Sequence, residues 1–586
     1  MSSFDIFYKK NNNEELFSYF SDNSDNRIKK MQNYIPIYSR FFSLQESNKH
    51  TINLNNKYSI KKIKKQESDN IFKIIVECDD ANKTTHVKNA FFKYSPLIDS
   101  TKYMAGKYKD ISKNIICQLP KLKKTVLKKL DCYDNSAYTD SFFSYLSSRV
   151  LHTYKFIHGI DFFGSFLGIK ENFKVDITDE LEYLYDYEYF HLNKNILFKT
   201  DKIHEELLDN DTRKNRKDVE IGKDVEIEIQ EINNDMFEGV FETLTEKNIE
   251  KHNLFINDIK TLNVDYERTT GVEHSKTNSL CSSRDSDTDS SDSGGSGGDS
   301  DSGGDSGSGG DSGGDSGGDS GGYSDGDSEF SDIKNDMGNI FATVFDFPCQ
   351  IICLENLENT MDHLIEETNI SENHLISGLF QVVMTLIVYQ KLFDFTHNDL
   401  HTNNIMYQKT DKKYIHYRYN NKYYSVPTYG KIYKIIDFGR AIYKFKGKQI
   451  SSDCFYNKGE AAGQYNFSIF KNKNKKEIKP NNAFDLSRLG CSLYDNYIGE
   501  NEIKSPLEKL ITEWVMDDNG KNILYKKNGE ERYPDFKLYK MISRKCTTNT
   551  PQAQLDKPVF QKFITSKRKI GKKSPVINID KLPIYI

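Results

Sequence analysis

The sequence predicts an α+β protein with a β-rich first part, a helical second part and a long acidic insertion between them. Runs rich in Ile, Val, Phe and Tyr, separated by Asp, Asn and Ser, open the first part at residues 57–65, 70–78 and 86–97. Consecutive runs of this kind with short links favour an antiparallel meander of strands. The second part contains a long apolar stretch at residues 375–392, which predicts a helix.

One helix and one further strand complete the β-rich part. Apolar residues from Tyr138 to Leu151 recur at roughly helical spacing and predict a helix over residues 136–154. Residues 156–169 predict another strand, and residues 345–357 predict a buried strand beyond the insertion. We therefore expect the two flanks of the insertion to pair with each other within one domain.

The insertion is dominated by an acidic tract. Residues 277–332 consist almost entirely of Asp, Ser and Gly, and no Lys or Arg occurs between Asp285 and Asp332. Such a segment buries too little apolar surface to offset its ordering entropy, so we expect disorder there. Closure entropy rises slowly with loop length, so a domain tolerates such an insertion. The expected organisation is an N-terminal extension, a β-rich part, an insertion, a helical part and a tail, at residues 1–50, 51–170, 171–344, 345–565 and 566–586.

The charge balance limits the expected partners. The chain has 81 basic and 86 acidic residues, a net charge of −5 at pH 7, and about fourteen of the acids lie between Asp285 and Asp332. The remainder therefore carries roughly +9, which suits phosphate-bearing ligands. Nucleic-acid binding usually needs a clustered basic patch, and the basic run at residues 121–129 is short, so we expect no nucleic-acid partner.

The sequence also predicts a soluble protein without a membrane segment. The start of the chain, "SSFDIFYKKNNNEE", lacks the apolar stretch of a secretory signal. The most apolar run, residues 375–389, contains Gln381 and is too short to span a bilayer, so it predicts a core helix. The nine cysteines include no CxxC pair and indicate neither a zinc ribbon nor a disulfide framework, which favours a reducing compartment.

Three polar residues in apolar surroundings predict a catalytic constellation. In "THNDLHTNN" (396–404), Asp399 lies five residues before Asn404, and Asp437 lies near the end of a predicted strand at residues 431–439. Phosphoryl transfer requires a carboxylate that accepts the proton of the attacking hydroxyl, and a second carboxylate and an amide oxygen that hold a hard cation. Turn and capping roles are the structural alternative for the same residues.

These residues carry a resemblance to a known family. "HNDLHTNN" (397–404) resembles the catalytic loop of protein kinases, and "IIDFGRA" (435–441) resembles their D-F-G strand end. "AFDLSRLG" (483–490) resembles the start of a later kinase helix, and "TPQAQLDKPVFQKF" (550–563) resembles the last helices of that fold. The resemblance implies a two-lobed protein-kinase-like fold, with a β-rich N-lobe and a helical C-lobe.

The resemblance covers about residues 50–170 and 345–565, in the order that the family shows. The context "PTYGKIYKIIDFGRAI" and the acidic insertion are similar to divergent serine/threonine-kinase-like proteins of giant DNA viruses. That similarity implies a location in the host cytoplasm or the virion.

The resemblance also assigns roles to individual residues. It implies that Asp399 is the catalytic base and that Asn404 and Asp437 bind Mg²⁺, or Mn²⁺, with ATP as the phosphate donor. Lys93, in "NAFFKYSP", matches the strand lysine that contacts the phosphates of ATP, although a solvent-facing lysine is the structural alternative.

Supporting roles are implied for three further residues. His397 braces the loop through backbone contacts, and Asp485 anchors the loop from below. Kinases pair the strand lysine with a helical Glu, but residues 136–154 contain no Glu and a single acid, Asp140. Asp140 is therefore the candidate substitute if the helix shifts.

The chain departs from the family at several points. No Gly occurs before Gly106, so the link at residues 64–70 must replace the Gly-rich loop that allows close approach to phosphate. Asn398 replaces the usual Arg, so no switch by activation-loop phosphorylation is expected. His401 stands in place of a Lys, and the resulting D-L-H-x-x-N string is similar to aminoglycoside phosphotransferases. No A-P-E motif precedes Asp485.

Several functions stay open at this point. The first is an active Mg-ATP phosphotransferase, a serine/threonine protein kinase with a protein substrate. The second is a pseudokinase that acts as a binding scaffold, and the third is an atypical small-molecule kinase. The Asp-Ser repeats are either acceptors of phosphate, in cis or in trans, or a soluble spacer. The sequence does not determine the oligomeric state.

Overall fold

The computed structural model shows a mixed α+β protein. The expected disordered tract at residues 277–332 lies outside the residues that the structure describes. The described residues are 4–10, 13–23, 26–49, 52–122, 127–201, 339–368, 370–457, 459–498 and 503–586.

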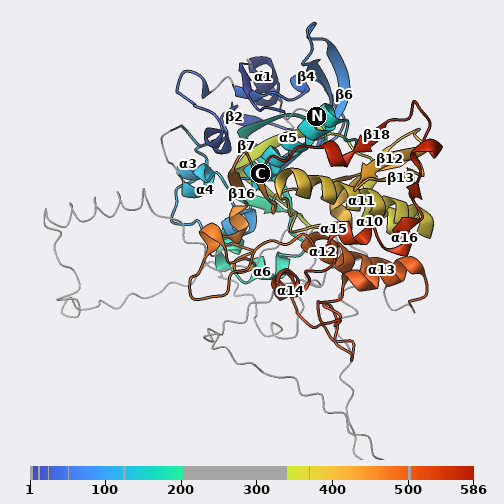
Figure 1. Ribbon diagram of the computed structural model, residues 1–586. Helices are drawn as coiled ribbons and strands as arrows, with labels where there is room; N and C mark the ends of the chain where they lie inside the picture. Colours follow the sequence, from blue (N-terminus) through green and yellow to red (C-terminus); the bar gives the residue numbers. More distant parts are fainter. Residues whose placement is uncertain are drawn as a thin grey trace, which may run out of the picture.

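A seven-stranded sheet forms the β-rich part, with the strand order β2–β7–β9–β6–β5–β4 and β8 paired to β9 (Figure 1). Every pairing in this sheet is antiparallel. The predicted meander is confirmed as β4, β5 and β6, and the burial of β5 alternates strictly because one face of the sheet covers the core. The strands are β2 (Ile28–Gln32), β4 (Tyr58–Gln66), β5 (Ile71–Cys78), β6 (Thr85–Pro96), β7 (Phe162–Asp176), β8 (Phe198–Thr200) and β9 (Phe341–Glu355).

The flanks of the insertion pair with each other, as predicted, but over a longer stretch than expected. Strands β7 and β9 are paired from Phe162 with Leu354 to Asp176 with Phe341. The pairing therefore continues beyond residue 170, where the β-rich part was expected to end. The strand also begins later than residue 156, because the preceding residues turn and bury Phe156 and His158 before the sheet starts.

The stretch expected to be an N-terminal extension adds a strand to the sheet and side chains to the hydrophobic core. Strand β2 pairs with β7 at the sheet edge. Helix α1 (Glu14–Asp22) precedes it and buries Leu16 and Phe20. The Phe20 ring lies 6.0 Å from the ring of Phe72 and 5.9 Å from that of Phe92, so residues before 50 help to close the core.

Helix α5 (Ser136–Tyr154) has the bounds that the sequence predicts and lies between the large sheet and helix α11 (Glu372–Phe393). The Ser147 hydroxyl lies 2.7 Å from the Tyr389 hydroxyl of α11, and the Phe143 ring packs against the same tyrosine. Asn135 caps the start of α5 by accepting from the Ala137 N–H. The buried position of α5 makes it the element that joins the two parts of the molecule.

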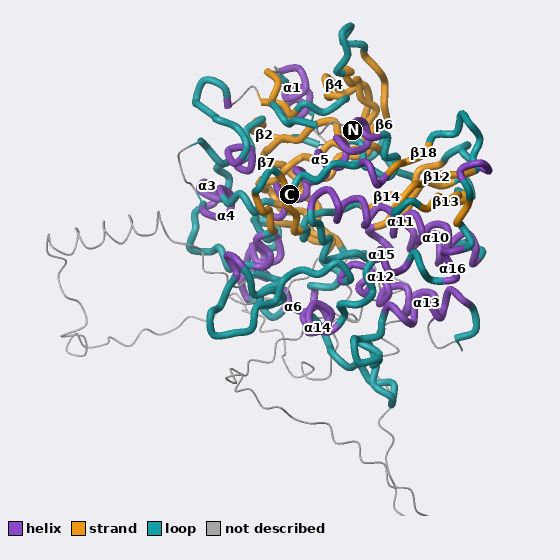
Figure 2. Tube along the Cα trace, in the orientation of Figure 1, coloured by secondary structure: helices purple, strands orange, loops and turns teal. Residues whose placement is uncertain are grey.

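Helices dominate the second part of the chain, around the buried helix α11 (Figure 2). Among the described residues, α11 is the one helix long and apolar enough to cross a membrane by length and composition, and 94% of its apolar window is buried inside the molecule. It is therefore packed as the core helix that the sequence predicts. The surrounding helices are α10 (Met361–Glu367), α12 (Phe484–Leu493), α13 (Pro506–Trp514), α14 (Lys537–Lys545), α15 (Pro551–Gln554) and α16 (Pro558–Gln561).

Small antiparallel ribbons complete the second part. Strand β11 lies between β10 and β14 in one small sheet. Strands β12 and β13, which lie between β11 and β14 in the sequence, form a hairpin. Strands β15 and β16 form a separate hairpin. The bounds are β10 (Asn359–Thr360), β11 (Ile405–Lys409), β12 (Tyr414–Tyr419), β13 (Lys422–Pro427), β14 (Lys431–Ile435), β15 (Ile442–Phe445) and β16 (Lys448–Ser451).

The C-terminal tail is tied to the core. Strand β18 (Val576–Asn578) pairs with β12, and the Tyr585 N–H donates to the Leu392 carbonyl oxygen over 2.9 Å. The Tyr585 hydroxyl accepts from the Phe4 N–H over 2.6 Å, so the two ends of the chain lie side by side (Figure 1).

Candidate active site

Strand pairing brings the two predicted motifs together. Ile405 of β11 pairs with Ile435 of β14, so the residues just before β11 and just after β14 lie at one edge. The Ile436 N–H accordingly donates to the Asn404 carbonyl oxygen over 3.0 Å. Asn404 and Asp437 therefore meet at the same cavity, although they are far apart in sequence.

The two predicted supporting residues hold the loop in place. Both carboxylate oxygens of Asp485, in the first turn of α12, accept backbone N–H groups, from His397 and from Asn398, each over 2.9 Å. The His397 ring is buried, and its Nε2 lies 2.9 Å from the Ile436 carbonyl oxygen. The loop at residues 396–404 is thus fixed to α12 through Asp485 and to the residue that follows β14 through His397.

Lys93 bridges two carboxylates from different elements. Its Nζ lies 2.8 Å from Asp140 Oδ2, on α5, and 2.8 Å from Asp437 Oδ1, beyond the end of β14. The structure therefore pairs Lys93 with Asp140, the single acid of α5 and the candidate partner from the sequence. The start of α5 lies close to β6, since Asn135 Nδ2 donates to the Leu97 carbonyl oxygen over 2.9 Å. The shorter acid can reach the lysine for this reason.

The two carboxylates beside Lys93 differ in environment. The Asp140 side chain is 4% exposed, whereas that of Asp437 is 42% exposed and faces the cavity. Burial raises the pKa of Asp140 despite the attraction of Lys93. At Asp437 burial acts in the same direction, but the Lys93 ammonium outweighs it and lowers the pKa below its ordinary value. Asp437 is therefore the ionised carboxylate that a ligand can reach.

Asp399 is held by groups that the sequence analysis did not identify. Its Oδ1 accepts from the Tyr539 hydroxyl over 2.8 Å, and Tyr539 in turn accepts from Arg488 Nε over 2.9 Å. Arg440 Nη1 lies 3.6 Å from Asp399 Oδ2. Burial disfavours the charge on Asp399, but the Arg440 guanidinium, the charge of Arg488 and the Tyr539 hydrogen bond together outweigh burial and hold the pKa well below its usual range. Asp399 is thus a carboxylate at neutral pH.

Sequence signals for these partners differ. Arg440 directly follows "IIDFG", so its neighbourhood could have drawn attention to it. Tyr539 lies 140 residues after Asp399 in a helix without a recognisable motif, and no local pattern marks it.

Asn404 presents its amide oxygen to the cavity. The Nδ2 group donates to the Asp399 carbonyl oxygen over 2.9 Å and lies 3.0 Å from His401 Nε2. Both hydrogens of the amide are thereby used within the loop, which leaves Oδ1 as the group for a ligand. Burial lowers the pKa of His401 to about 3, so this position carries no cation at neutral pH.

These side chains line one cavity of about 430 Å³, which contains Lys93, Asp399, Asn404, Asp437 and Arg440. Arg440 is 8% exposed, and its Nη1 makes no hydrogen bond to any described residue. The described part of the chain contains no group of three or more His, Cys, Asp or Glu side chains placed to hold a metal ion. A Mg²⁺ ion with two protein ligands and further oxygens from phosphate and water is nevertheless a common arrangement.

The link at residues 64–70, which is expected from the sequence in the place of a Gly-rich loop, bonds to itself. The N–H groups of Glu67 and Ser68 both donate to the Ile71 carbonyl oxygen, over 2.8 and 3.2 Å. The Ile71 N–H donates to Ser68 Oγ over 3.2 Å. These amides are engaged within the turn, so they do not point at a phosphate in this conformation.

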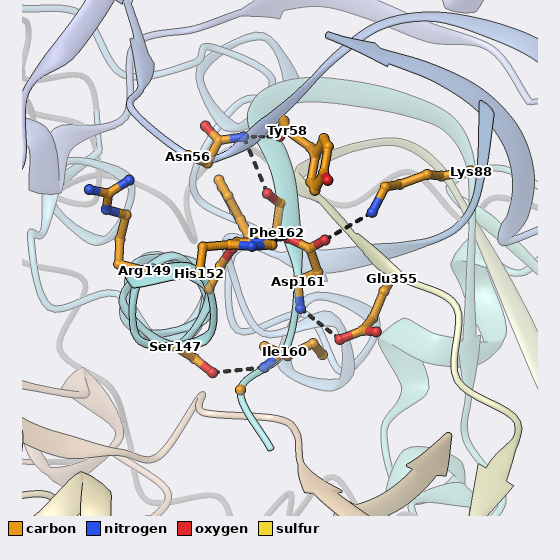
Figure 3. A network of polar contacts seen from close by, with 12 residues as sticks. Asn56, Tyr58, Lys88, Ser147, Arg149, His152, Ile160, Asp161, Phe162 and Glu355 are labelled. Atoms are coloured by element: carbon orange, nitrogen blue, oxygen red, sulfur yellow. Dashed lines mark hydrogen bonds and ion pairs between the residues drawn. The ribbon is translucent and has the colours of Figure 1, made fainter. Parts of the chain in front are cut away.

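A second polar network ties the other end of α5 to strand β9 (Figure 3). Asp161 accepts from His152 Nε2 over 2.7 Å and from Lys88 Nζ over 3.2 Å, and its N–H donates to Glu355 Oε1 over 2.7 Å. His152 belongs to α5 and Glu355 ends β9. The network therefore fixes the orientation of α5, the helix from which Asp140 contacts Lys93.

Comparisons with known proteins find partial similarities. The chain is 33% identical over 97 residues to the serine/threonine-protein kinase haspin of Bos taurus, a match that covers 16% of this chain and 12% of haspin. It is 36% identical over 114 residues to a probable serine/threonine-protein kinase of Dictyostelium discoideum, covering 17% and 9% of the two chains. It is 27% identical over 196 residues to uncharacterized protein 098R of Invertebrate iridescent virus 6, covering 32% and 29%.

Each match spans less than a third of the relative's length, and no family model matches the chain. The matches to the two kinases indicate a kinase-like relationship over the stretches that they cover.

Proposed function

We propose that the chain is an ATP-dependent phosphotransferase, a divergent serine/threonine protein kinase with a two-lobed kinase-like arrangement. The observation that carries this proposal is the cavity in which the Lys93–Asp437 ion pair, Asn404 and the ionised Asp399 face one another. Phosphoryl transfer needs little beyond such positioning and charge neutralisation. The partial similarities to serine/threonine kinases support the same class of activity.

In the proposed reaction the hydroxyl oxygen of the acceptor attacks the γ-phosphorus of ATP. The bond between that phosphorus and the oxygen bridging to the β-phosphate breaks, and ADP leaves. The hydroxyl proton moves to Asp399 Oδ2, since Tyr539 occupies Oδ1. A strongly acidic carboxylate suits this role because a loose transition state requires the hydroxyl to be oriented before it loses its proton.

The residues present fit a divalent cation and the phosphates of ATP. Asn404 Oδ1 and the free oxygen of Asp437 would hold Mg²⁺ or Mn²⁺, since hard cations prefer oxygen ligands. When bound, the metal neutralises charge on the phosphate oxygens. The Lys93 ammonium, between two carboxylates, is placed to contact a phosphate beside the metal. Arg440, with a buried Nη1 that lacks a hydrogen bond among the described residues, adds a second cation.

A pseudokinase that serves as a binding scaffold is the second candidate. It is favoured by the turn at residues 67–70, in which the Glu67 and Ser68 amides are engaged internally and which contains no Gly. Weak nucleotide binding would follow from such a turn. An atypical small-molecule kinase is a third candidate, since His401 occupies the place of the usual Lys.

The test uses the purified chain, Mg-ATP labelled at the γ-phosphate and a mixed serine/threonine peptide acceptor. Asp399→Asn is the test variant, and Asp411→Asn, at an exposed position away from the cavity, is its matched control. We expect label transfer by the wild type and the control but not by Asp399→Asn. Equal transfer by all three proteins would contradict the assignment of Asp399. No transfer by any of them, without a thermal shift on adding Mg-ATP, would favour the scaffold.

A further inference from the structure

A second cavity, of about 1430 Å³, opens beside the candidate active site. We call it the basic groove, because seven basic side chains and one carboxylate, Asp453, line it. Aromatic residues, among them Tyr456 and Phe470, form part of its wall. The basic side chains are Lys128, Lys129, Lys471, Lys473, Lys475, Lys476 and Arg544.

Four of these lysines lie on one loop that a single asparagine holds in shape. Asn466 and Ile478 exchange two backbone hydrogen bonds at the base of the loop, over 2.9 and 3.1 Å. Asn466 Nδ2 also lies 3.0 Å from the Lys475 carbonyl oxygen and 2.7 Å from that of Lys476. The backbone is therefore held from inside, and the lysine side chains of the loop are exposed.

The positive charge of the basic groove is largely uncompensated. Lys129 pairs with Asp453 over 2.5 Å, but the four loop lysines and Lys128 form no ion pair with any described residue. Arg544 donates to the Gly463 carbonyl oxygen over 2.8 Å and has no carboxylate partner among the described residues. Such a concentration of like charge costs stability through self-repulsion and attracts an anionic ligand.

The basic groove is continuous with the candidate active site. Lys129 and Asp453 line both cavities. Arg544, at the edge of the basic groove, lies on α14, the helix whose Tyr539 hydroxyl bonds to Asp399. A polypeptide bound in the basic groove can therefore place one of its side chains beside Asp399, the carboxylate that would accept the proton.

We propose that the basic groove binds the acceptor, and that the acceptor is the acidic, serine-containing segment at residues 285–332 of this chain. This proposal rests on the proposed phosphotransferase function for its chemistry. The segment complements the basic groove, since it contains about fourteen acidic residues and no Lys or Arg, and a Ser follows most of its aspartates.

The positions of the residues that flank residues 202–338 agree with this assignment. The Asp201 N–H donates to the Phe341 carbonyl oxygen over 2.9 Å, so both ends lie together beside β9. Asp176, which pairs with Phe341, and the nearby Glu180 line the candidate active-site cavity. A stretch of thirty residues from the segment would span roughly 100 Å when extended. A folded chain of about 430 residues has a radius of gyration of roughly 22 Å, so the segment is long enough to reach the basic groove.

The proposed step transfers one phosphate to a serine of the segment. The serine Oγ attacks the γ-phosphorus of ATP, its proton goes to Asp399, and ADP leaves. Each phosphoserine adds a charge of roughly −1.5 to −2, so modification increases the complementarity between segment and groove.

Zero-length crosslinking of the full chain tests the contact without requiring catalysis. A carbodiimide joins a carboxylate to a lysine only where the two groups form an ion pair. We expect crosslinks from aspartates of residues 285–332 to Lys475 and Lys476, identified by mass spectrometry after cleavage before aspartate. We expect few to Lys412 and Lys413, an exposed pair outside both cavities. Crosslinks spread equally over both pairs, or absent from the groove, would overturn the proposal.

Peptide kinetics test the specificity. The acceptor is a synthetic peptide of residues 299–320, compared with the same peptide carrying Asn at every Asp. We expect kcat/KM for the acidic peptide to be about tenfold higher, and the advantage to shrink as salt rises. Lys475→Glu with Lys476→Glu should abolish the advantage through KM, whereas Lys412→Glu with Lys413→Glu should preserve it.

Failure of this inference and failure of the proposed function are distinguishable. Equal use of the two peptides by an active enzyme would overturn the groove assignment alone. An inactive enzyme that still gives the groove crosslinks would overturn the phosphotransferase but not the contact. Protection of Lys475 and Lys476 by a single-stranded oligonucleotide, with no crosslinks to the segment, would assign the basic groove to nucleic acid instead.

Discussion

Asp140 uses its two carboxylate oxygens to join Lys93 to the backbone at Phe438, just beyond the end of β14. Its Oδ2 lies 2.8 Å from Lys93 Nζ, and its Oδ1 accepts from the Phe438 N–H over 3.0 Å. One buried side chain of α5 thus sets the position of the strand lysine and of the backbone beside Asp437. The candidate active site is complete only while α5 keeps this position.

We expect Asp140→Asn to impair the proposed phosphoryl transfer, although Asp140 is not proposed to contact the acceptor. The amide provides one acceptor in place of two and carries no charge, so either Lys93 or Phe438 loses its partner. A small displacement of positioned groups costs about a hundredfold in rate. Steady-state kinetics with Mg-ATP would measure this loss, and Asp140→Glu, which keeps the charge, should retain more activity. Asp110→Asn, at an exposed site, is the control. Wild-type kinetics in Asp140→Asn would refute the positioning role.

Tyr539→Phe should shift the pH dependence of the reaction. Removal of the hydroxyl deletes a hydrogen bond to the ionised form of Asp399, so the pKa of this carboxyl should rise. The acidic limb of the kcat/KM profile should therefore move to higher pH, by up to about one unit. Tyr429→Phe, at an exposed position, should leave the profile unchanged. An unshifted profile would show that Tyr539 does not act on Asp399.

Arg440→Gln should move the same limb further. Arg440 is the largest influence that favours the charge on Asp399, and it also pairs with Glu460 over 3.3 Å. Its loss removes the strongest interaction that offsets burial, so the pKa of Asp399 should rise by about one to two units. Arg440→Lys should rescue only part of the effect, since an ammonium cannot reproduce the geometry of a guanidinium. Arg27→Gln, at an exposed position, is the control and should leave the profile unchanged. Full rescue by lysine, or a profile of Arg440→Gln that matches that of the control, would contradict this account.

His401 should make the fold less stable in acid. Its pKa is about 3 in the folded protein, because burial disfavours the imidazolium, against roughly 6.5 in the unfolded chain. Between these values the unfolded chain binds more protons, so the stability contributed by neutral His401 is present above pH 6.5 and is lost as pH falls towards 3. The loss amounts to as much as about 4 kcal/mol.

Urea unfolding at a series of pH values would measure this loss. The His401→Gln chain should lose less stability than the wild type between pH 6.5 and 3, whereas His363→Gln, at an exposed position, should behave as the wild type does. Parallel pH profiles for the wild type and His401→Gln would show that His401 does not titrate as the structure indicates.

The sequence by itself determined the elements whose signals are local. The apolar spacing in residues 136–154 predicted the bounds of α5, and the alternating runs predicted β4 to β6, because strand and helix periods are written into neighbouring residues. The spacing between Asp399 and Asn404 likewise marked the loop, since both lie on one tight turn.

Only the tertiary structure decided which distant groups meet. The pairing of Lys93 with Asp140 depends on how closely α5 approaches β6, and the contact of Tyr539 with Asp399 depends on where α14 packs. The place of residues before 50 within the sheet, and of the tail against α11, depends on the same packing. Contacts of this kind arise from the burial of apolar faces across the whole molecule, which no short window of sequence encodes.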